Sequence, residues 1–385
     1  MNVPRAVLSA VSRAAPLAPP LPHGGGARNW RSAPGGGHQA PDHAPHLVRP
    51  AVETGLRLAC RFAAVVALIA AISLPGSAQA GDIQGDGGKV RLLYNEPGTN
   101  SFPPFVIKKF ALDKKYGFEL VPIAVGTPQA GVNAMQSGGA DVGLFDWITM
   151  ARVQNAGVKL IGIAPFLIWA NTVIVPANSP AKTLADLKGK KVGIYSRNNL
   201  DWVVMRTYTH RRFNFDLEKE ATVHEGAVPL LRGLADQGQL DAVQMFNSLT
   251  PDMVASGKYR VLATIRGLIK ELGMPDTPFL MYAVDSKFAT AYPARVKAFL
   301  AAYREALDIL GKDDAVWVER GTIMKLQGQA LTLFRDEARE DMMGKFEPQT
   351  EADIRKVFAV LLETGGAQLL GIDALPKEFM TLAYQ

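Results

Sequence analysis

The chain has 385 residues, of which 48% are hydrophobic and 20% are charged, so it is long enough to form two domains with separate cores. Its formal net charge of +6 comes mostly from the first 80 residues, which hold seven of the 42 Lys and Arg but two of the 36 Asp and Glu. The remaining 35 basic and 34 acidic residues nearly cancel, which argues against a nucleic-acid partner because such binding needs a concentrated basic face.

The N-terminal 50 residues are rich in Pro and Gly and show no apolar periodicity. Such a segment cannot bury enough apolar surface to offset its ordering entropy, so residues 1–50 are expected to form a disordered extension. A start codon assigned too early would explain them equally well. The single cysteine, Cys60, lies in the following segment, before residue 81, which excludes disulfides, thiolate catalysis and cysteine metal sites from the body of the chain.

Residues 51–80 have the pattern of a signal peptide. Arg57 and Arg61 precede the apolar stretch Phe62–Leu74, and small residues follow up to Ala80. The apolar stretch is shorter than the roughly 20 residues that a membrane-spanning helix needs. We therefore expect cleavage near Ala80 and a periplasmic location.

From Lys89 onward, short strand-like and helix-like segments alternate, as is typical of βαβ units. The predicted elements are a strand at Lys89–Tyr94, a helix at Phe105–Lys115, a strand at Phe118–Val125, a helix at Pro128–Gln136 and a strand at Ala140–Phe145. The second of these helices is expected to start after the cap residue Thr127, with Pro128 at its first position, and to end before Gly138 and Gly139.

The same order of elements returns about a hundred residues later. Gly238 and Asp241 follow Gly138 and Asp141 at this spacing. The corresponding elements are a strand at Lys191–Tyr195, a helix opened by Pro229 and a strand at Leu240–Met245. The repeat predicts two lobes of similar build, although α/β segments resemble one another even without such a relationship.

Two groups of prolines interrupt this pattern, at Pro176 with Pro180 and at Pro275 with Pro278. Two interruptions suggest that the chain crosses to a second lobe and returns at the strand Phe279–Val284. We therefore expect lobe 1 to comprise residues 81–177 and 280–385, and lobe 2 residues 178–279. The last part is predicted to be helical at Ala294–Leu310, Asp313–Gln327 and Thr350–Thr364, the last with a capping-box-like pair of Thr350 and Asp353 and an end at Gly365 and Gly366.

Several segments resemble the nitrate/sulfonate/taurine solute-binding family of ABC importers, which also includes thiamine-precursor-binding proteins. The most specific is Thr183–Ile194, and the likeness covers roughly Lys89–Leu310. The other segments are Lys114–Gly117, Ser137–Gly143, Gly238–Val243 and Tyr292–Ala306. The resemblance implies an α/β type II periplasmic-binding fold, with two lobes joined by two crossover strands and a ligand cleft between them.

The same resemblance implies how the protein acts. It implies a monomer that takes a small-molecule ligand to an ABC permease in the inner membrane, without catalysis and without a cofactor. The ligands of this family are diverse, so the ligand does not follow from the fold.

Ligands of open α/β sheets bind beyond the carboxyl ends of strands, and four strand ends, two from each lobe, therefore point to the candidate site. These ends combine aromatic side chains with neutral hydrogen-bonding groups. The candidate ligand-binding residues are Tyr94, Asn95, Glu96, Thr99, Asn100, Phe145, Asp146, Trp147, Tyr195, Ser196, Asn198, Asn199, Phe246 and Asn247. We further expect Trp147 and Tyr195 to face each other across the cleft.

The charges at these strand ends leave the ligand class open. Arg197 is the sole cation among them, whereas an anion would meet Glu96, Asp146 and Asp201. A cationic or aromatic amine therefore fits at least as well as a sulfonate or nitrate. Asp201 also has a purely structural interpretation, as the N-cap of a helix beginning at Trp202.

A receptor for a metal ion is a further alternative, because Glu96, Asp146, Asp201 and Glu225 could converge as oxygen ligands. Hydrolase, zinc and phosphate-loop motifs are missing from the sequence. An enzyme that makes a thiamine precursor would need a His- and Cys-rich site, which this body lacks. A ligand-sensing docking protein remains open as a third interpretation.

Overall fold

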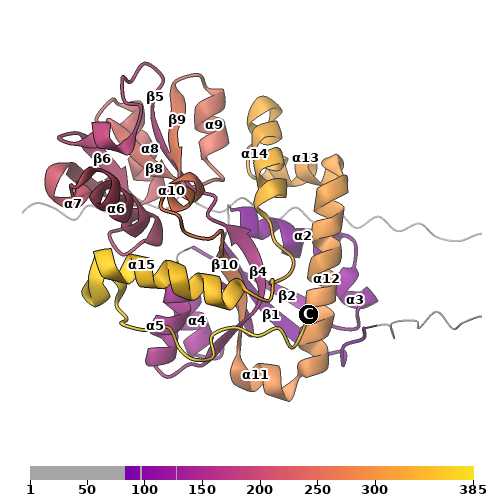
Figure 1. Ribbon diagram of the computed structural model, residues 1–385. Coiled ribbons are helices and arrows are strands. Elements are labelled where there is room, and N and C mark those ends of the chain that lie inside the picture. Colours follow the sequence, from indigo (N-terminus) through magenta and orange to yellow (C-terminus); the bar gives the residue numbers. More distant parts are fainter. Residues whose placement is uncertain (1–82, 96–97, 127) are drawn as a thin grey trace, which may run out of the picture. The chain divides into compact units, whose positions relative to one another are not determined.

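The computed structural model of the protein describes residues 83–95, 98–126 and 128–385 (Figure 1). The predicted extension at 1–50 and the signal peptide at 51–80 lie outside the described residues and stay predictions. The same holds for Glu96 of the candidate site and for Thr127 as a helix cap.

The first sheet has five strands in the order β2-β1-β3-β10-β4. β1 pairs in parallel with β2 and β3, whereas β10 is antiparallel to β3 and β4. The strands are β1 (Lys89–Asn95), β2 (Glu119–Val125), β3 (Val142–Asp146), β4 (Leu160–Ile168) and β10 (Pro278–Asp285). The four strands that the sequence predicted here are confirmed to within two residues at each end.

The second sheet repeats this arrangement with the order β7-β6-β8-β5-β9. β6 is parallel to β7 and β8, and β5 is antiparallel to β8 and β9. The strands are β5 (Thr172–Pro176), β6 (Lys191–Ile194), β7 (Thr222–Glu225), β8 (Ala242–Met245) and β9 (Tyr259–Thr264). The prediction of two α/β lobes is confirmed.

Two segments connect the sheets, residues 169–171 between β4 and β5 and residues 272–277 before β10. The predicted boundary at residue 177 is therefore wrong, because β5 belongs to the second sheet. Pro176 ends β5 opposite Tyr259 instead of marking the crossing. A proline can mark the end of a strand in either sheet, so it does not show by itself which sheet that strand joins.

The predicted internal repeat is visible in matching hydrogen bonds. Arg91 N donates to Asp141 Oδ2 at 2.9 Å, and Lys191 N donates to Asp241 Oδ2 at 2.8 Å. Each aspartate also returns its own backbone N–H to the carbonyl of the same partner residue. The two lobes thus tie the start of their first strand to the start of a neighbouring strand in the same way.

The two aspartates should nevertheless differ in their contribution to stability. Asp141 is buried and also accepts from the Arg91 guanidinium, with Nη2 to Oδ1 at 2.6 Å, whereas Asp241 is exposed. We expect Asp141→Ala to lower the free energy of unfolding by about 2–3 kcal/mol and Asp241→Ala by about 1 kcal/mol, as measured by urea unfolding. Equal losses would contradict this account.

Helices follow the strands in both lobes. Those of the first half of the chain are α2 (Phe102–Lys109), α3 (Leu112–Lys115), α4 (Pro128–Gln136) and α5 (Trp147–Asn155), with the 3₁₀ turn η1 (Thr99–Ser101). The second lobe has η2 (Leu184–Leu187), α6 (Leu200–Phe213), α7 (Leu217–Glu220), α8 (Val228–Asp236), α9 (Thr250–Ala255) and α10 (Ile265–Glu271). The predicted helix Phe105–Lys115 is interrupted at Ala111, which takes a left-handed conformation with φ 51°.

The C-terminal part adds α11 (Ser286–Ala291), α12 (Pro293–Lys312), α13 (Asp314–Ile323), α14 (Gly328–Asp341) and α15 (Thr350–Leu370). The predicted capping box of α15 is wrong, since Gln349 precedes the helix without a side-chain cap. Helical structure also resumes after Gly366, where φ 72° and ψ 161° produce a kink. In the described part of the chain, no helix combines the length and the apolar character needed to span a membrane.

The predicted lobe 1 included residues 280–385, which implied that helix α15 packs on the first lobe alone. In the structure, α15 packs on both lobes. Its Phe358 ring contacts Trp147 of α5, and Val203 of α6 lies against Gly365. Arg152 of α5 donates from Nε to the Leu370 carbonyl at 2.7 Å. Figure 1 shows α15, in yellow, running beside α6 and α5. One apolar cluster therefore includes side chains from both lobes and from this helix.

Candidate functional site

Two parallel strands in each lobe lead into the candidate site, and each of these four strands is followed by a helix or a helical turn. β1 and β3 lead to η1 and α5 in the first lobe, and β6 and β8 lead to α6 and α9 in the second. This geometry gathers the side chains after each strand at one edge of its sheet. The predicted residues therefore fall into one group for each lobe.

In the first lobe, asparagine side chains hold the turn that follows β1. Asn100 Nδ2 donates to Asn95 Oδ1 at 2.9 Å, and Asn95 Nδ2 donates to the Val125 carbonyl. Thr99 and Asn100 are buried, and Tyr94 is half-buried. The amides of Asn95 and Asn100 thus bind each other in this structure.

The β3 end places its aromatic residues in the protein core. Phe145 is buried over Gly143, where an added Cβ would lie 2.3 Å from the Phe145 ring. Trp147 is fully buried, with ring centroids 6.3 Å from those of both Trp169 and Phe358. Its Nε1 has no hydrogen-bond partner among the described residues. The expected aromatic walls are therefore core residues here.

Asp146, between these two aromatics, is the N-cap of α5. Its carboxylate accepts from Thr149 N at 2.8 Å and from Thr149 Oγ1 at 2.6 Å. The side chain is half-buried, so it keeps some access to solvent.

In the second lobe, Asp201 does not cap α6 as the structural interpretation expected. Asn199 is the N-cap and accepts from Asp201 N at 2.9 Å. The Asp201 side chain is fully buried, and its Oδ2 accepts from Asn171 Nδ2 at 2.7 Å and Gln244 Nε2 at 2.8 Å. Oδ1 has no partner among the described residues. Burial raises the pKa of this carboxyl to about 6.

Around Asp201, neutral side chains form a continuous polar network. Gln244 Nε2 also donates to Asn199 Oδ1, and Asn171 Oδ1 accepts from Asn247 N at 3.1 Å. Thr99 Oγ1 of the first lobe lies 3.4 Å from Asn247 Oδ1 of the second. The network, defined by Thr99, Asn171, Asn199, Asp201, Gln244 and Asn247, therefore links the first crossing segment to both lobes.

Sequence reasoning left out two members of this network, Asn171 and Gln244, and named Asp201 only as a helix cap or a metal ligand, outside the set of solute-binding residues. One signal was present, because Gln244 is the polar residue in the otherwise apolar strand Ala242–Met245. A buried amide in such a strand needs hydrogen-bond partners and so marks a polar site. Asn171 carried no comparable signal, since it lies in a connection.

The remaining second-lobe candidates cluster away from Trp147. The rings of Tyr195 and Phe246 lie 5.1 Å apart and pack on the same apolar cluster. The expectation that Tyr195 faces Trp147 is therefore wrong, because the ring contacts of Trp147 are with Trp169 and Phe358. Ser196 Oγ accepts from Asn198 N in the turn before α6, and Asn198 is exposed.

Arg197, the cation expected at the strand ends, is held by two carboxylates. Its Nε lies 2.9 Å from Glu218 Oε1 and its Nη1 lies 2.7 Å from Glu225 Oε2. These contacts raise the pKa of Arg197 and lower that of Glu225. Within residues 83–95, 98–126 and 128–385, no three His, Cys, Asp or Glu side chains are grouped to hold a metal ion. The alternative of a metal site is therefore contradicted for Asp146, Asp201 and Glu225, and its fourth residue, Glu96, lies outside the described residues.

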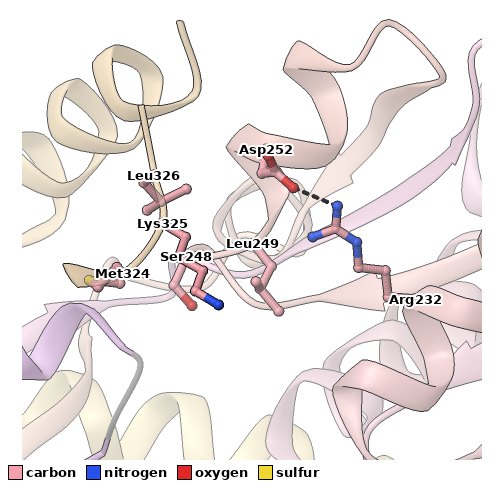
Figure 2. Close-up of a pocket in the computed structure, with 7 residues that line it drawn as sticks. All are labelled: Arg232, Ser248, Leu249, Asp252, Met324, Lys325 and Leu326. Atoms are coloured by element: carbon pink, nitrogen blue, oxygen red, sulfur yellow. Dashed lines mark hydrogen bonds and ion pairs between the residues drawn. The ribbon is translucent and has the colours of Figure 1, made fainter. Parts of the chain in front are cut away.

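Next to the network, a cavity of about 210 Å³ lies between the second lobe and the segment joining α13 to α14 (Figure 2). The second lobe contributes Arg232, Ser248, Leu249 and Asp252, and the first contributes Met324, Lys325 and Leu326. Figure 2 shows Arg232 directed at Asp252, and their Nη2 and Oδ2 atoms lie 2.5 Å apart. Ser248 directly follows Asn247, so the cavity borders the polar network.

Two five-stranded sheets of the same strand order, joined by two crossing segments and linked at their polar strand ends, define the two-lobed fold of periplasmic solute-binding proteins. A family model described as NMT1/THI5 like matches residues 114–314, and the chain belongs to this family.

Solved structures support the fold assignment. The alkanesulfonate-binding protein from Xanthomonas axonopodis pv. citri, bound to MOPS, superposes with a TM-score of 0.60 at 19% identity over 75% of this chain and 94% of that one. The periplasmic aliphatic sulphonate binding protein of Escherichia coli has the same score at 22% identity, over 76% and 95% of the two chains. The periplasmic nitrate-binding protein of Synechocystis PCC 6803 scores 0.51 at 14% identity, over 66% of this chain and 71% of that one.

A curated relative shares sequence as well. A protein named as an aliphatic sulfonates-binding protein of Escherichia coli (strain K12) is 28% identical over 134 residues, which are 34% of this chain. The match spans 41% of that relative's length.

Proposed function

We propose that the protein is an exported receptor that binds a small organic solute between its lobes and delivers it to an ABC permease of the inner membrane. The observation that carries this proposal is the polar network around Asp201, which reaches Thr99 across the lobes through Asn247. Buried polar groups at such an interface are the groups that orient a ligand in a closing cleft.

The names of its relatives support the same function. Members of the fold are named as sulfonate- and nitrate-binding proteins, and none of the relatives reported above is named as an enzyme. We place the binding residues of this chain at the four strand ends, with Asn171, Asp201 and Gln244 added to the set predicted from sequence. The protein is further proposed to act as a periplasmic monomer, because closure on a ligand needs both lobes free to move.

A thermal-shift screen of the protein purified after export tests this function. The panel contains sulfonates, nitrate, pyrimidines, amines, and divalent and trivalent metal ions. A ligand that binds only the folded state at a hundred times its Kd stabilises that state by about 2.7 kcal/mol, which raises Tm by about 4 °C for a protein of this size. We expect such a shift with one organic class.

Recovery of the bound compound then separates a receptor from an enzyme. A receptor releases its ligand chemically unchanged and in a 1:1 ratio, as measured by mass spectrometry of the denatured complex. A converted ligand would refute the receptor function, and a panel without any shift would favour a docking role.

A further inference from the structure

The polar network contains one buried charge whose counter-charge is missing among the described residues. Asp201 is fully buried, and the groups that donate to its Oδ2 are the uncharged amides of Asn171 and Gln244. Its Oδ1 is also buried and has no partner in the described part of the chain. Proteins rarely leave a carboxylate in this state, because a buried charge is costly unless it is paired.

A second carboxylate from the opposite lobe adds to this negative potential. Asp146, at the end of β3, interacts unfavourably with the ionised form of Asp201 and contributes to the raised pKa of Asp201. The two residues come from different lobes. A cation bound to Asp201 would therefore also be attracted by Asp146.

The cation nearest in sequence cannot supply this charge. Arg197 follows β6, but its guanidinium is bound to Glu218 at 2.9 Å and to Glu225 at 2.7 Å. An oxyanion entering the cleft would therefore meet Asp201 and Asp146 without help from Arg197. The described arginine beside the turn after β1, Arg320, donates from Nε to Ser101 Oγ at 3.2 Å.

We infer that the solute carries a positively charged nitrogen, as a protonated amine or amidine, and that Asp201 is the residue that selects it. This inference rests on the receptor function proposed above and specifies its ligand. The N–H groups of such a ligand fill the unpaired Oδ1, and its charge balances the two carboxylates. A hard metal ion is disfavoured, because no third His, Cys, Asp or Glu side chain among the described residues joins these two carboxylates.

Isothermal titration of the purified protein with benzylamine, benzamidine, ethanesulfonate, nitrate and Zn²⁺ tests the inference. We expect at least one of the two cationic organic probes to bind. Asp201→Asn should then weaken its affinity by about thirtyfold or more, because a buried charge pair loses one partner. The asparagine retains an acceptor for Asn171 and Gln244, so the variant is expected to fold.

Two further variants control for net charge and for folding. Asp241→Asn removes the same charge at the opposite edge of the second sheet and should leave affinity within about twofold. Asp146→Asn keeps a good helix N-cap. It should lower the affinity for the cationic probe less than Asp201→Asn does. Affinity should also fall as the pH drops through about 6, where Asp201 takes up a proton; Asp146 is the charged group that acts on it there.

The possible outcomes are distinct. Binding of ethanesulfonate or nitrate, with no organic cation bound, overturns the inference and leaves the receptor function standing. Unchanged affinity in Asp201→Asn overturns the role of this residue. Binding of Zn²⁺ alone, or of no probe at all, contradicts both the inference and the proposed organic-solute receptor.

Discussion

Replacement of Trp147 with alanine should lower the free energy of unfolding by about 3–5 kcal/mol. The indole is fully buried and packs edge-on against Trp169 of the first crossing segment and Phe358 of α15. Its removal would leave a cavity where both lobes and the C-terminal helix meet, and such a site has little freedom to collapse. Urea unfolding of the unliganded protein, followed by circular dichroism, measures the loss.

Two other variants show whether this effect comes from the core. Trp147→Phe keeps an aromatic ring in contact with Phe358 and should cost clearly less than the alanine variant. Tyr195→Ala, at a half-buried ring that packs on Phe246, should cost about 1–2 kcal/mol. If Trp147→Ala unfolded like the wild type and only bound ligand more weakly, Trp147 would be a cleft wall, as the sequence alone suggested.

Asp201→Asn should make the unliganded protein more stable at pH 7.5, by roughly 1–3 kcal/mol. In the folded protein the pKa of Asp201 is raised from 3.8 to about 6, so the folded state holds its proton more tightly than the unfolded state. Stability therefore falls as pH rises from about 4 to about 6 and stays lower above that range. Two pKa units correspond to about 3 kcal/mol, from which the cost of burying the new amide is subtracted.

The pH dependence is the decisive part of this prediction. The gain of Asp201→Asn over the wild type should shrink as pH falls and be lost below about pH 3, where Asp201 of the wild type is protonated in both the folded and the unfolded state. Asp241→Asn, at an exposed carboxylate, should show no gain that grows between pH 4 and pH 7.5. A loss of stability in Asp201→Asn at pH 7.5 would mean that the ionised carboxylate is already paired in the unliganded protein, and would remove the basis for a cationic ligand.

The two predictions use separate measurements on the unliganded protein and do not depend on finding the solute. Together they would establish that Trp147 stabilises the fold and that Asp201 destabilises it. A residue that costs stability in the absence of ligand is typical of a binding site, since selection for stability alone would replace it.

Much of the fold could be predicted because its signals are local. The alternation of short strands and helices and the glycines at 138 and 238 depend on neighbouring residues. So do the starts of α4 and α8, where a proline is the first or second helical residue. The hundred-residue repeat followed from the spacing of Asp141 and Asp241, which make the same backbone contact in each lobe. The second-lobe boundary was misplaced, because sheet membership of β5 depends on its pairing with β8 and β9.

The candidate site, too, has features that depend on local sequence and features that depend on long-range contacts. The sequence by itself determined two repeated α/β units and polar residues at their strand ends, because periodicity and turn residues act over a few positions. Only the tertiary structure decided that Trp147 and Phe145 belong to the core, and that Asp201 is buried between Asn171 and Gln244. Burial and hydrogen-bond partners arise from segments that are distant in sequence, and the crossing of the chain between two lobes brings those segments together.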